Sequence, residues 1–164
     1  MASPIPRTRN RSRSAMALVI REATPSQVDH LMEASTILLQ SLYPEESNHL
    51  VDPTDLSAEG NLLLGAEELD TFIGCVGYVE RGDYAEVKRL FVSQEFRGQG
   101  VARVLMAELE SRAVDAGHTI MRLETGIHQP DAMTLFETLR YQIRAPFGDY
   151  VDDPLSVFME KKLT

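Results

Sequence analysis

The feature that most constrains this chain is an apolar strand that runs through a glycine-bearing turn directly into a long amphipathic helix. Residues 90–103 have the sequence LFVSQEFRGQGVAR. The first N–H groups of a helix have no carbonyl partner, and the helix dipole adds positive potential there. Glycines at such a start let a phosphate approach the backbone closely. The stretch predicts a pyrophosphate cradle, although a glycine-rich helix start that binds nothing would have the same pattern.

This stretch differs from the two common nucleotide-binding motifs. A P-loop needs Lys and then Ser or Thr after its last glycine, and the dinucleotide fingerprint needs the spacing G-x-G-x-x-G. Here Gly100 is followed by VARVL. The sequence therefore indicates a cradle of a different kind.

Apolar periodicity around the stretch predicts alternating strands and helices. Thr24, Pro25 and Gln27 are typical of a helix start, with an N-cap, a proline at the first helical position and a capping box. Because antiparallel hairpins stand beside a strand–helix–strand crossover, we predict an α/β fold with a mixed, mostly antiparallel sheet flanked by helices. We expect strands at 18–21, 61–67, 71–81, 84–92, 119–124, 141–145 and 155–160, helices after 24, at 98–117 and at 131–139, and a loop at 43–57.

The chain has a net negative charge that is carried entirely by the residues after the first 15. Its 164 residues carry 16 Lys+Arg against 25 Asp+Glu, which gives a formal net charge of −9. Such a chain is a poor binder of nucleic acid and attracts a cationic small molecule more readily. The length is that of one domain, which we place at residues 16–164.

Residues 1–15 differ in composition from the rest of the chain. Their sequence, MASPIPRTRNRSRSA, is rich in Pro, Ser and Arg and contains no acid. This composition predicts a disordered tail, with an arm for RNA or another anionic partner as the alternative.

Deleting residues 1–15 is expected to leave the melting temperature and the activity nearly unchanged, because a disordered polar tail buries little surface. Thermal melts and rate measurements on the two chain lengths test this. A loss of several degrees would show that the arginines dock on the acidic body.

The cysteine, histidine and hydropathy patterns exclude several other classes of protein. Cys75 is the only cysteine, so no internal disulfide can form, and we predict a reducing, cytoplasmic location. Cys75 itself is expected to be a small core side chain. The four histidines show no metal-ligand spacing, so we expect no metal. No apolar run approaches the ~18 residues of a membrane-spanning helix, so we expect no membrane partner.

Two motifs in sequence order resemble the GNAT N-acetyltransferase superfamily. The first is RGQGVA at 97–102 after LFV, which resembles the acetyl-CoA motif of that family. The second comprises LETG at 123–126 and AMTLFETLRY at 132–141. The likeness covers residues 17–163. A further likeness, to an uncharacterised bacterial branch of the YsnE type, lies in YPEESNH at 43–49, EVKR at 86–89, FGDY at 147–150 and DPLSVFM at 153–159.

The resemblance implies acetyl-CoA as co-substrate and a set of residues that bind it. The backbone of Leu90, Phe91 and Val92 would pair with the pantetheine arm like an added strand. One N–H near Val92 would polarise the thioester carbonyl. Gln129 stands where many relatives have an Asn that touches the pantetheine arm. The pyrophosphate would lie against the turn and helix start formed by Arg97, Gly98, Gln99, Gly100, Val101, Ala102 and Arg103.

Transfer to an amine needs a base, because a protonated alkyl amine has a pKa of about 10. The two candidates are Glu86, on the strand that leads to the cofactor motif, and Glu124, at the end of the next strand. We expect Glu86 as the first choice, although either carboxylate could instead be solvated or paired with a cation.

One departure from the family pattern concerns the general acid. Many relatives have a tyrosine where this sequence has Phe136, and phenylalanine cannot donate a proton. A thiolate with a pKa of about 8.5 can leave unassisted. The alternative donors are Tyr43, Tyr141, Tyr150 and His128.

We therefore expect an N-acetyltransferase that acts on a primary amine of a small molecule by direct attack. The alternatives are a protein N-terminal or lysine acetyltransferase, and a non-catalytic acyl-CoA-binding module. Glu45 and Glu46, with His49, are candidates for reading the acceptor amine. A homodimer could form if residues 155–160 are an edge strand that pairs with a second copy.

Overall fold

A computed structural model describes residues 17–164, so the predicted tail at 1–15 lies outside the described residues. The described chain forms a seven-stranded sheet in the order β1-β2-β3-β4-β5-β7-β6. All neighbouring strands are antiparallel except β4 and β5. This confirms the predicted α/β fold with a mixed, mostly antiparallel sheet. The strands are β1 (Leu18–Glu22), β2 (Leu62–Glu68), β3 (Thr71–Glu80), β4 (Ala85–Val92), β5 (Ile120–Gly126), β6 (Gln142–Arg144) and β7 (Ser156–Lys162).

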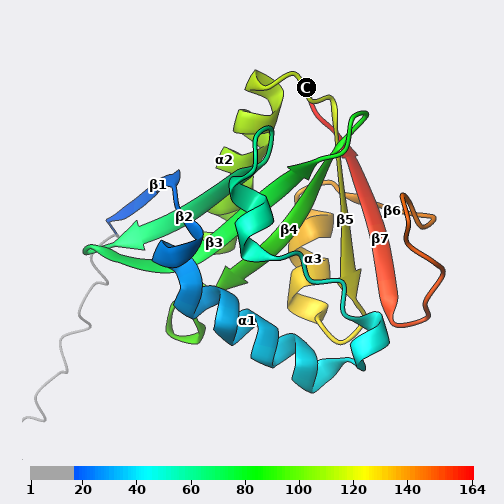
Figure 1. The fold of residues 1–164 in the computed structure, drawn as a ribbon, viewed down its shortest axis with the longest axis horizontal. Coiled ribbons are helices and arrows are strands. Elements are labelled where there is room, and N and C mark those ends of the chain that lie inside the picture. The colour runs from blue at the N-terminus through cyan, green and yellow to red at the C-terminus, as the bar shows by residue number, and fades with distance from the viewer. Residues whose placement is uncertain (1–16) are drawn as a thin grey trace, which may run out of the picture.

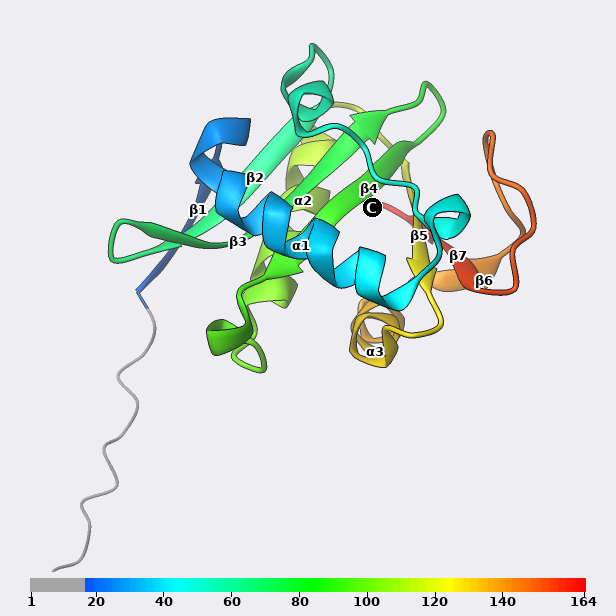
Figure 2. The same cartoon turned by 60° about the horizontal axis from the view of Figure 1, so that its bottom comes forward.

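Helices cover both faces of the sheet, as Figures 1 and 2 show. One apolar cluster joins α2 (Val101–Asp115) and α3 (Pro130–Thr138) to one face, and another joins α1 (Asp29–Leu42) to the other. The alternation in β2 decides which face each side chain meets: Leu62 and Leu64 pack in the first cluster and Leu63 in the second. Cys75 is fully buried in the α1 cluster, as its sequence environment predicts, and burial raises the pKa of its thiol to about 12.

The predicted helix start at Thr24 begins with a short 3-10 turn. The turn spans Pro25–Val28 and leads directly into α1. The side-chain oxygen of Gln27 accepts the N–H of Thr24 at 2.8 Å, which is one half of the predicted capping box. The loop expected at 43–57 contains two further 3-10 turns, Glu45–Ser47 and Pro53–Ser57.

The parallel pair β4 and β5 separates soon after it begins. Their register contains only two pairs, Ala85 with Met121 and Glu86 with Arg122. Beyond Glu86 the backbone of β4 is paired with β3 alone, across an irregularity between Cys75 and Gly77 of β3. Opposite this irregularity, Arg89 of β4 has a φ of +61°, a conformation that L residues rarely adopt. The divergence leaves a gap between β4, which leads into the first sequence motif, and β5, which carries the start of the second.

Two expectations about the elements are corrected. The strand predicted at 155–160 is not an edge strand, because β7 pairs with β5 on one side and with β6 on the other. It therefore offers no free backbone to a second copy, and the edges of the described sheet are β1 and β6. The helix predicted from residue 98 begins at Val101, because Gly98 and Gly100 adopt left-handed φ values outside the helical range. No helix within residues 17–164 has the length and apolarity needed to cross a bilayer.

Candidate active site

The glycine turn before α2 leaves its backbone open to the surroundings. Gly98 and Gly100 have φ values of +74° and +84°, and a Cβ added at either would meet no atom within 4 Å. Gly100 is the N-cap of α2, so the N–H groups of the helix's first turn face outward without an intrahelical acceptor. Space, unpaired donors and the positive end of a helix dipole together fit an anionic group such as a pyrophosphate.

The side chains of this turn hold its shape. Arg97 donates its Nε–H to the carbonyl oxygen of Val92 at 2.9 Å, and its guanidinium lies 5.2 Å from the centre of the Phe91 ring. Gln99 donates its side-chain N–H to the carbonyl of Glu95 at 3.3 Å. Further along, the side chain of Val101 is buried, that of Ala102 is half-buried and that of Arg103 is exposed. The binding role of these residues stays a prediction, for which the backbone N–H groups of the turn are the available donors.

A cavity of about 130 Å³ lies beside the divergence of β4 and β5. Its walls come from α1, the loop after α1, β4, β5, α3 and the loop before β7. The cavity brings together several of the residues that the sequence assigned to the site: Tyr43, His49, Leu90, Phe91, Glu124 and Gln129. Glu86 and the glycine turn do not line it.

Glu124 lies in the wall of this cavity, at the end of β5. Its Oε1 accepts the hydroxyl of Ser156 on β7 at 2.9 Å. Burial raises the pKa of this carboxyl to about 7, and the negative charges of Glu86 and Asp153 act in the same direction, while the Ser156 hydrogen bond and Lys88 oppose it. A carboxyl with such a pKa can accept a proton near neutral pH and release it again.

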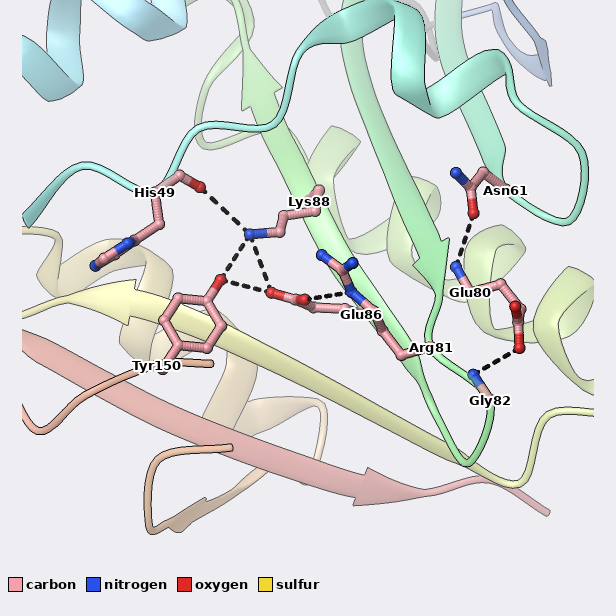
Figure 3. A network of polar contacts seen from close by, with 8 residues as sticks. All are labelled: His49, Asn61, Glu80, Arg81, Gly82, Glu86, Lys88 and Tyr150. Carbon is pink, nitrogen blue, oxygen red and sulfur yellow. Dashed lines mark hydrogen bonds and ion pairs between the residues drawn. The ribbon is translucent and has the colours of Figure 1, made fainter. Parts of the chain in front are cut away.

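Glu86 is placed differently. Its side chain is almost wholly buried on β4 and both of its oxygens have partners (Figure 3). Arg81 reaches Oε1 at 3.1 Å, whereas Lys88 at 3.0 Å and the hydroxyl of Tyr150 at 2.6 Å reach Oε2. Of the two candidate bases, only Glu124 lines the cavity.

The loop after α1 is held over the cavity by three contacts, and we call residues 47–50 the roof. Lys88 donates to the carbonyl of His49 at 3.3 Å and to the hydroxyl of Tyr150 at 2.6 Å. The rings of His49 and Tyr150 meet edge to face at 5.0 Å. Ser47 donates to Asp153 at 2.7 Å and thereby ties the roof to the loop before β7. Sequence reasoning assigned no role to Lys88 or Ser47, although both lie in the segments that resemble the YsnE type.

Tyr43 fixes the floor of the cavity between β5 and α3. Its hydroxyl accepts the N–H of His128 at 3.0 Å and donates to the side-chain oxygen of Gln129 at 3.3 Å. The ring fits only because residue 126 is glycine: a Cβ there would stand 1.9 Å from the Tyr43 hydroxyl oxygen and 2.2 Å from Cζ.

Gly126→Ala is therefore expected to displace the Tyr43 ring and to lower the free energy of unfolding by about 1–3 kcal/mol, as overpacking does. Urea unfolding measures the change. The double variant Gly126→Ala/Tyr43→Leu is the matched control, because it removes the ring that the new methyl group would meet. If Gly126→Ala lowered the free energy of unfolding equally in the parent and in Tyr43→Leu, this account would be wrong.

Among the alternative proton donors, only Tyr43 lines the cavity. Phe136, in the family's tyrosine position, is buried in the cavity wall and packs against Tyr141 at 5.7 Å. The hydroxyl of Tyr141 points to the sulfur of Met121 in the core, and burial raises its pKa. Tyr150 donates to Glu86, and burial together with that carboxylate raises its pKa as well. Within residues 17–164, no group of three or more His, Cys, Asp or Glu side chains is arranged to hold a metal ion.

Comparison with known proteins places this geometry among acetyltransferases. A sequence model of the acetyltransferase (GNAT) family matches residues 28–140. IAA acetyltransferase of Azospirillum brasilense is 39% identical over 150 residues, which are 89% of this chain and 98% of that protein. The uncharacterized N-acetyltransferase YsnE of Bacillus subtilis is 31% identical over 152 residues, which are 90% of this chain and 100% of that protein. The expected resemblance to the YsnE type is confirmed.

Solved structures agree with the sequence relatives. A candidate acyl-CoA N-acyltransferase from Klebsiella pneumoniae superposes with a TM-score of 0.76 at 30% identity, over 90% of this chain and 99% of that one. The PaiA N-acetyltransferase of Thermoplasma acidophilum was solved with coenzyme A. It superposes with a TM-score of 0.71 at 20% identity, over 90% of this chain and 99% of that one. The expected acyltransferase fold is confirmed.

Proposed function

The chain belongs to the acetyltransferase (GNAT) family, and from that premise we propose that it transfers an acetyl group from acetyl-CoA to a primary amine of a small molecule. It is an acetyl-CoA-dependent N-acetyltransferase. The class of acceptor, the roles of the residues that act on it and a cytoplasmic location are part of what we propose.

The observation that carries the proposal is the covered cavity with Glu124 in its wall. The roof bounds it on one side through Ser47, His49 and Lys88, so the space beside Glu124 is a partly covered pocket. A peptide acceptor needs a groove that its chain can enter and leave, whereas a metabolite needs a pocket. The name of the Azospirillum relative, IAA acetyltransferase, also supports a small-molecule acceptor.

The cofactor side of the proposal rests on two features of the backbone. The N–H groups from Gly98 to Arg103 surround an open, electropositive helix start that suits a pyrophosphate. The backbone of Leu90, Phe91 and Val92 runs along the gap between β4 and β5, where a pantetheine arm can pair with it. The thioester at the end of that arm supplies the activated acetyl group.

The chain's own groups then carry out three tasks. Glu124 takes the proton from the acceptor ammonium, so that the neutral amine can attack. An N–H near Val92 donates to the carbonyl oxygen as negative charge develops on it. The nitrogen adds to the carbonyl carbon, and the C–S bond then breaks, so that the thiolate leaves with the electron pair. The nitrogen gives up its second proton in this step, and the sulfur takes up one proton to become the CoA thiol. Tyr43, whose hydroxyl lies in the cavity wall, is the proposed relay for that proton.

An amine-panel assay with acetyl-CoA, which follows the release of the CoA thiol, tests the proposed function. We expect turnover with small primary amines and none with peptides that present a free N-terminus or a lysine. Turnover with peptides alone would establish the protein acetyltransferase instead. Binding of acetyl-CoA without turnover of any amine would establish the non-catalytic acyl-CoA-binding module.

A further inference from the structure

The charge of the cavity wall is opposite to that of the chain. The chain as a whole has a formal net charge of −9, but its cavity is lined by Lys88 and Arg89 against a single acid, Glu124. A site that only gathered a cationic amine would not place two cations beside it, because like charges repel most strongly where water is partly excluded.

Arg89 is a half-buried cation without a carboxylate partner. Its guanidinium donates to the carbonyl of Met32 at 3.0 Å and to the hydroxyl of Thr36 at 3.1 Å, both uncharged groups of α1. Among residues 17–164 no carboxylate lies within the 4.0 Å of an ion pair with it, and residues 1–16 contain no acid. Asp52 acts on it only from a longer distance, and burial lowers the pKa of Arg89.

Lys88 shares its carboxylate with a second cation. Glu86 pairs with both Lys88 and Arg81, so these three side chains retain one positive charge (Figure 3). Tyr150 does not neutralise that charge, because its hydroxyl donates to Glu86 and stays protonated. In the lining of the cavity itself, the two cations Lys88 and Arg89 face the single carboxylate Glu124, while Asp52 and Asp153, outside the lining, act on Arg89 and Glu124. When Glu124 takes up a proton, the net positive charge of the cavity lining increases by one.

From this imbalance we infer that the acceptor carries a carboxylate as well as its amine, and that Lys88 and Arg89 recognise the carboxylate. The inference rests on the proposed function and narrows its substrate class to small amino acids. Glu124 on β5 then handles the amine, while the two cations on the neighbouring strand β4 hold the carboxylate within the same cavity. Hydrogen bonds between a carboxylate and charged donors are shorter and stronger than neutral ones, which suits them to this discrimination.

The test compares matched acceptors. Several α-amino acids are assayed with acetyl-CoA beside the amine that lacks the carboxylate and beside the amino-acid amide, in which the carboxylate is neutral. Rates are corrected for the neutral fraction of each amine. We expect kcat/KM to be about 10- to 100-fold higher for the amino acid than for either analogue, the range of a charge-assisted hydrogen bond.

Variants of Lys88 tie this preference to the cavity. Lys88→Met keeps most of the apolar stem and leaves Glu86 paired with Arg81, so the fold should persist; it is expected to lower the preference for the carboxylated acceptor about tenfold or more. Lys88→Arg should restore the preference, because it restores the charge. Lys162→Met, which removes an exposed lysine at the end of β7, is the matched control and should leave the preference as it is.

The outcomes separate this inference from the proposed function. Equal kcat/KM for an amino acid and its two analogues overturns the inference and leaves a small-molecule N-acetyltransferase. An undiminished preference in Lys88→Met overturns the assignment of the carboxylate to this wall. If the parent acetylates no small amine, the proposed function and the inference fall together.

Discussion

A Gly100→Glu variant is expected to lose acetyl-CoA binding, with affinity lower by about 100-fold or more. The new side chain would bring a negative charge to the helix start where the pyrophosphate is proposed to lie, and such like-charge contacts cost several kcal/mol. It would also fill the open space beside a residue whose φ is +84°. Isothermal titration calorimetry measures the affinity directly.

Gly117→Glu is the matched control for that experiment. Gly117 follows the other end of the same helix, has a φ of +93° and also has open space where a Cβ would be. The control therefore introduces the same charge and the same backbone strain far from the glycine turn. If Gly100→Glu bound acetyl-CoA like the parent, the cradle would have to lie elsewhere on the chain.

Glu124→Gln is expected to lower kcat/KM at neutral pH by about 10²–10⁴-fold, which is the contribution of a general base. Because the pKa of Glu124 is raised to about 7, the parent's basic form predominates only above that pH. The parent's kcat/KM should therefore rise as pH increases through about 7 and then level off. The variant should lack that rise and recover activity only near the amine's own pKa of about 10. Its affinity for acetyl-CoA should hardly change.

Glu86→Gln separates the two carboxylates that the sequence offered. Glu86 does not line the cavity and is already held by Lys88, Arg81 and Tyr150. Its substitution should alter stability and the position of Lys88 and keep a rise of kcat/KM with pH, moved to somewhat lower pH because the negative charge of Glu86 helps to raise the pKa of Glu124. If Glu86→Gln removed that rise and Glu124→Gln did not, Glu86 would be the base, as the sequence alone suggested.

Local features of the chain were predictable because neighbouring residues determine them. The turn at Gly98 and Gly100, the helix after it and the capping interaction at Gln27 each depend on a few consecutive side chains. The place of β7 inside the sheet could not be derived in this way. Its apolar alternation is the same whether one neighbour or two neighbours pair with it, and the partner β6 is only three residues long.

The features of the site that escaped sequence reasoning all join distant segments. Ser47 and Asp153 are 106 positions apart, and Lys88 reaches the carbonyl of His49 across 39. By sequence position, Glu86 near the start of β4 and Glu124 near the end of β5 are both plausible bases, with Glu86 the first choice. Only the packed structure surrounds one of them with cations and leaves the other beside a cavity with a raised pKa.

The divergence of β4 from β5 makes the sheet two half-sheets, β1–β4 and β5–β7–β6, that share only two residue pairs. At the open end, amides of β4 have no strand of the second half to bond with. A pantetheine arm in the gap would act as an eighth strand, so its binding energy would also be folding energy. Ligand at 100 times its Kd adds about 2.7 kcal/mol to the stability of a folded protein. The resistance of this chain to unfolding, and thus its lifetime, would then follow the supply of acetyl-CoA around it.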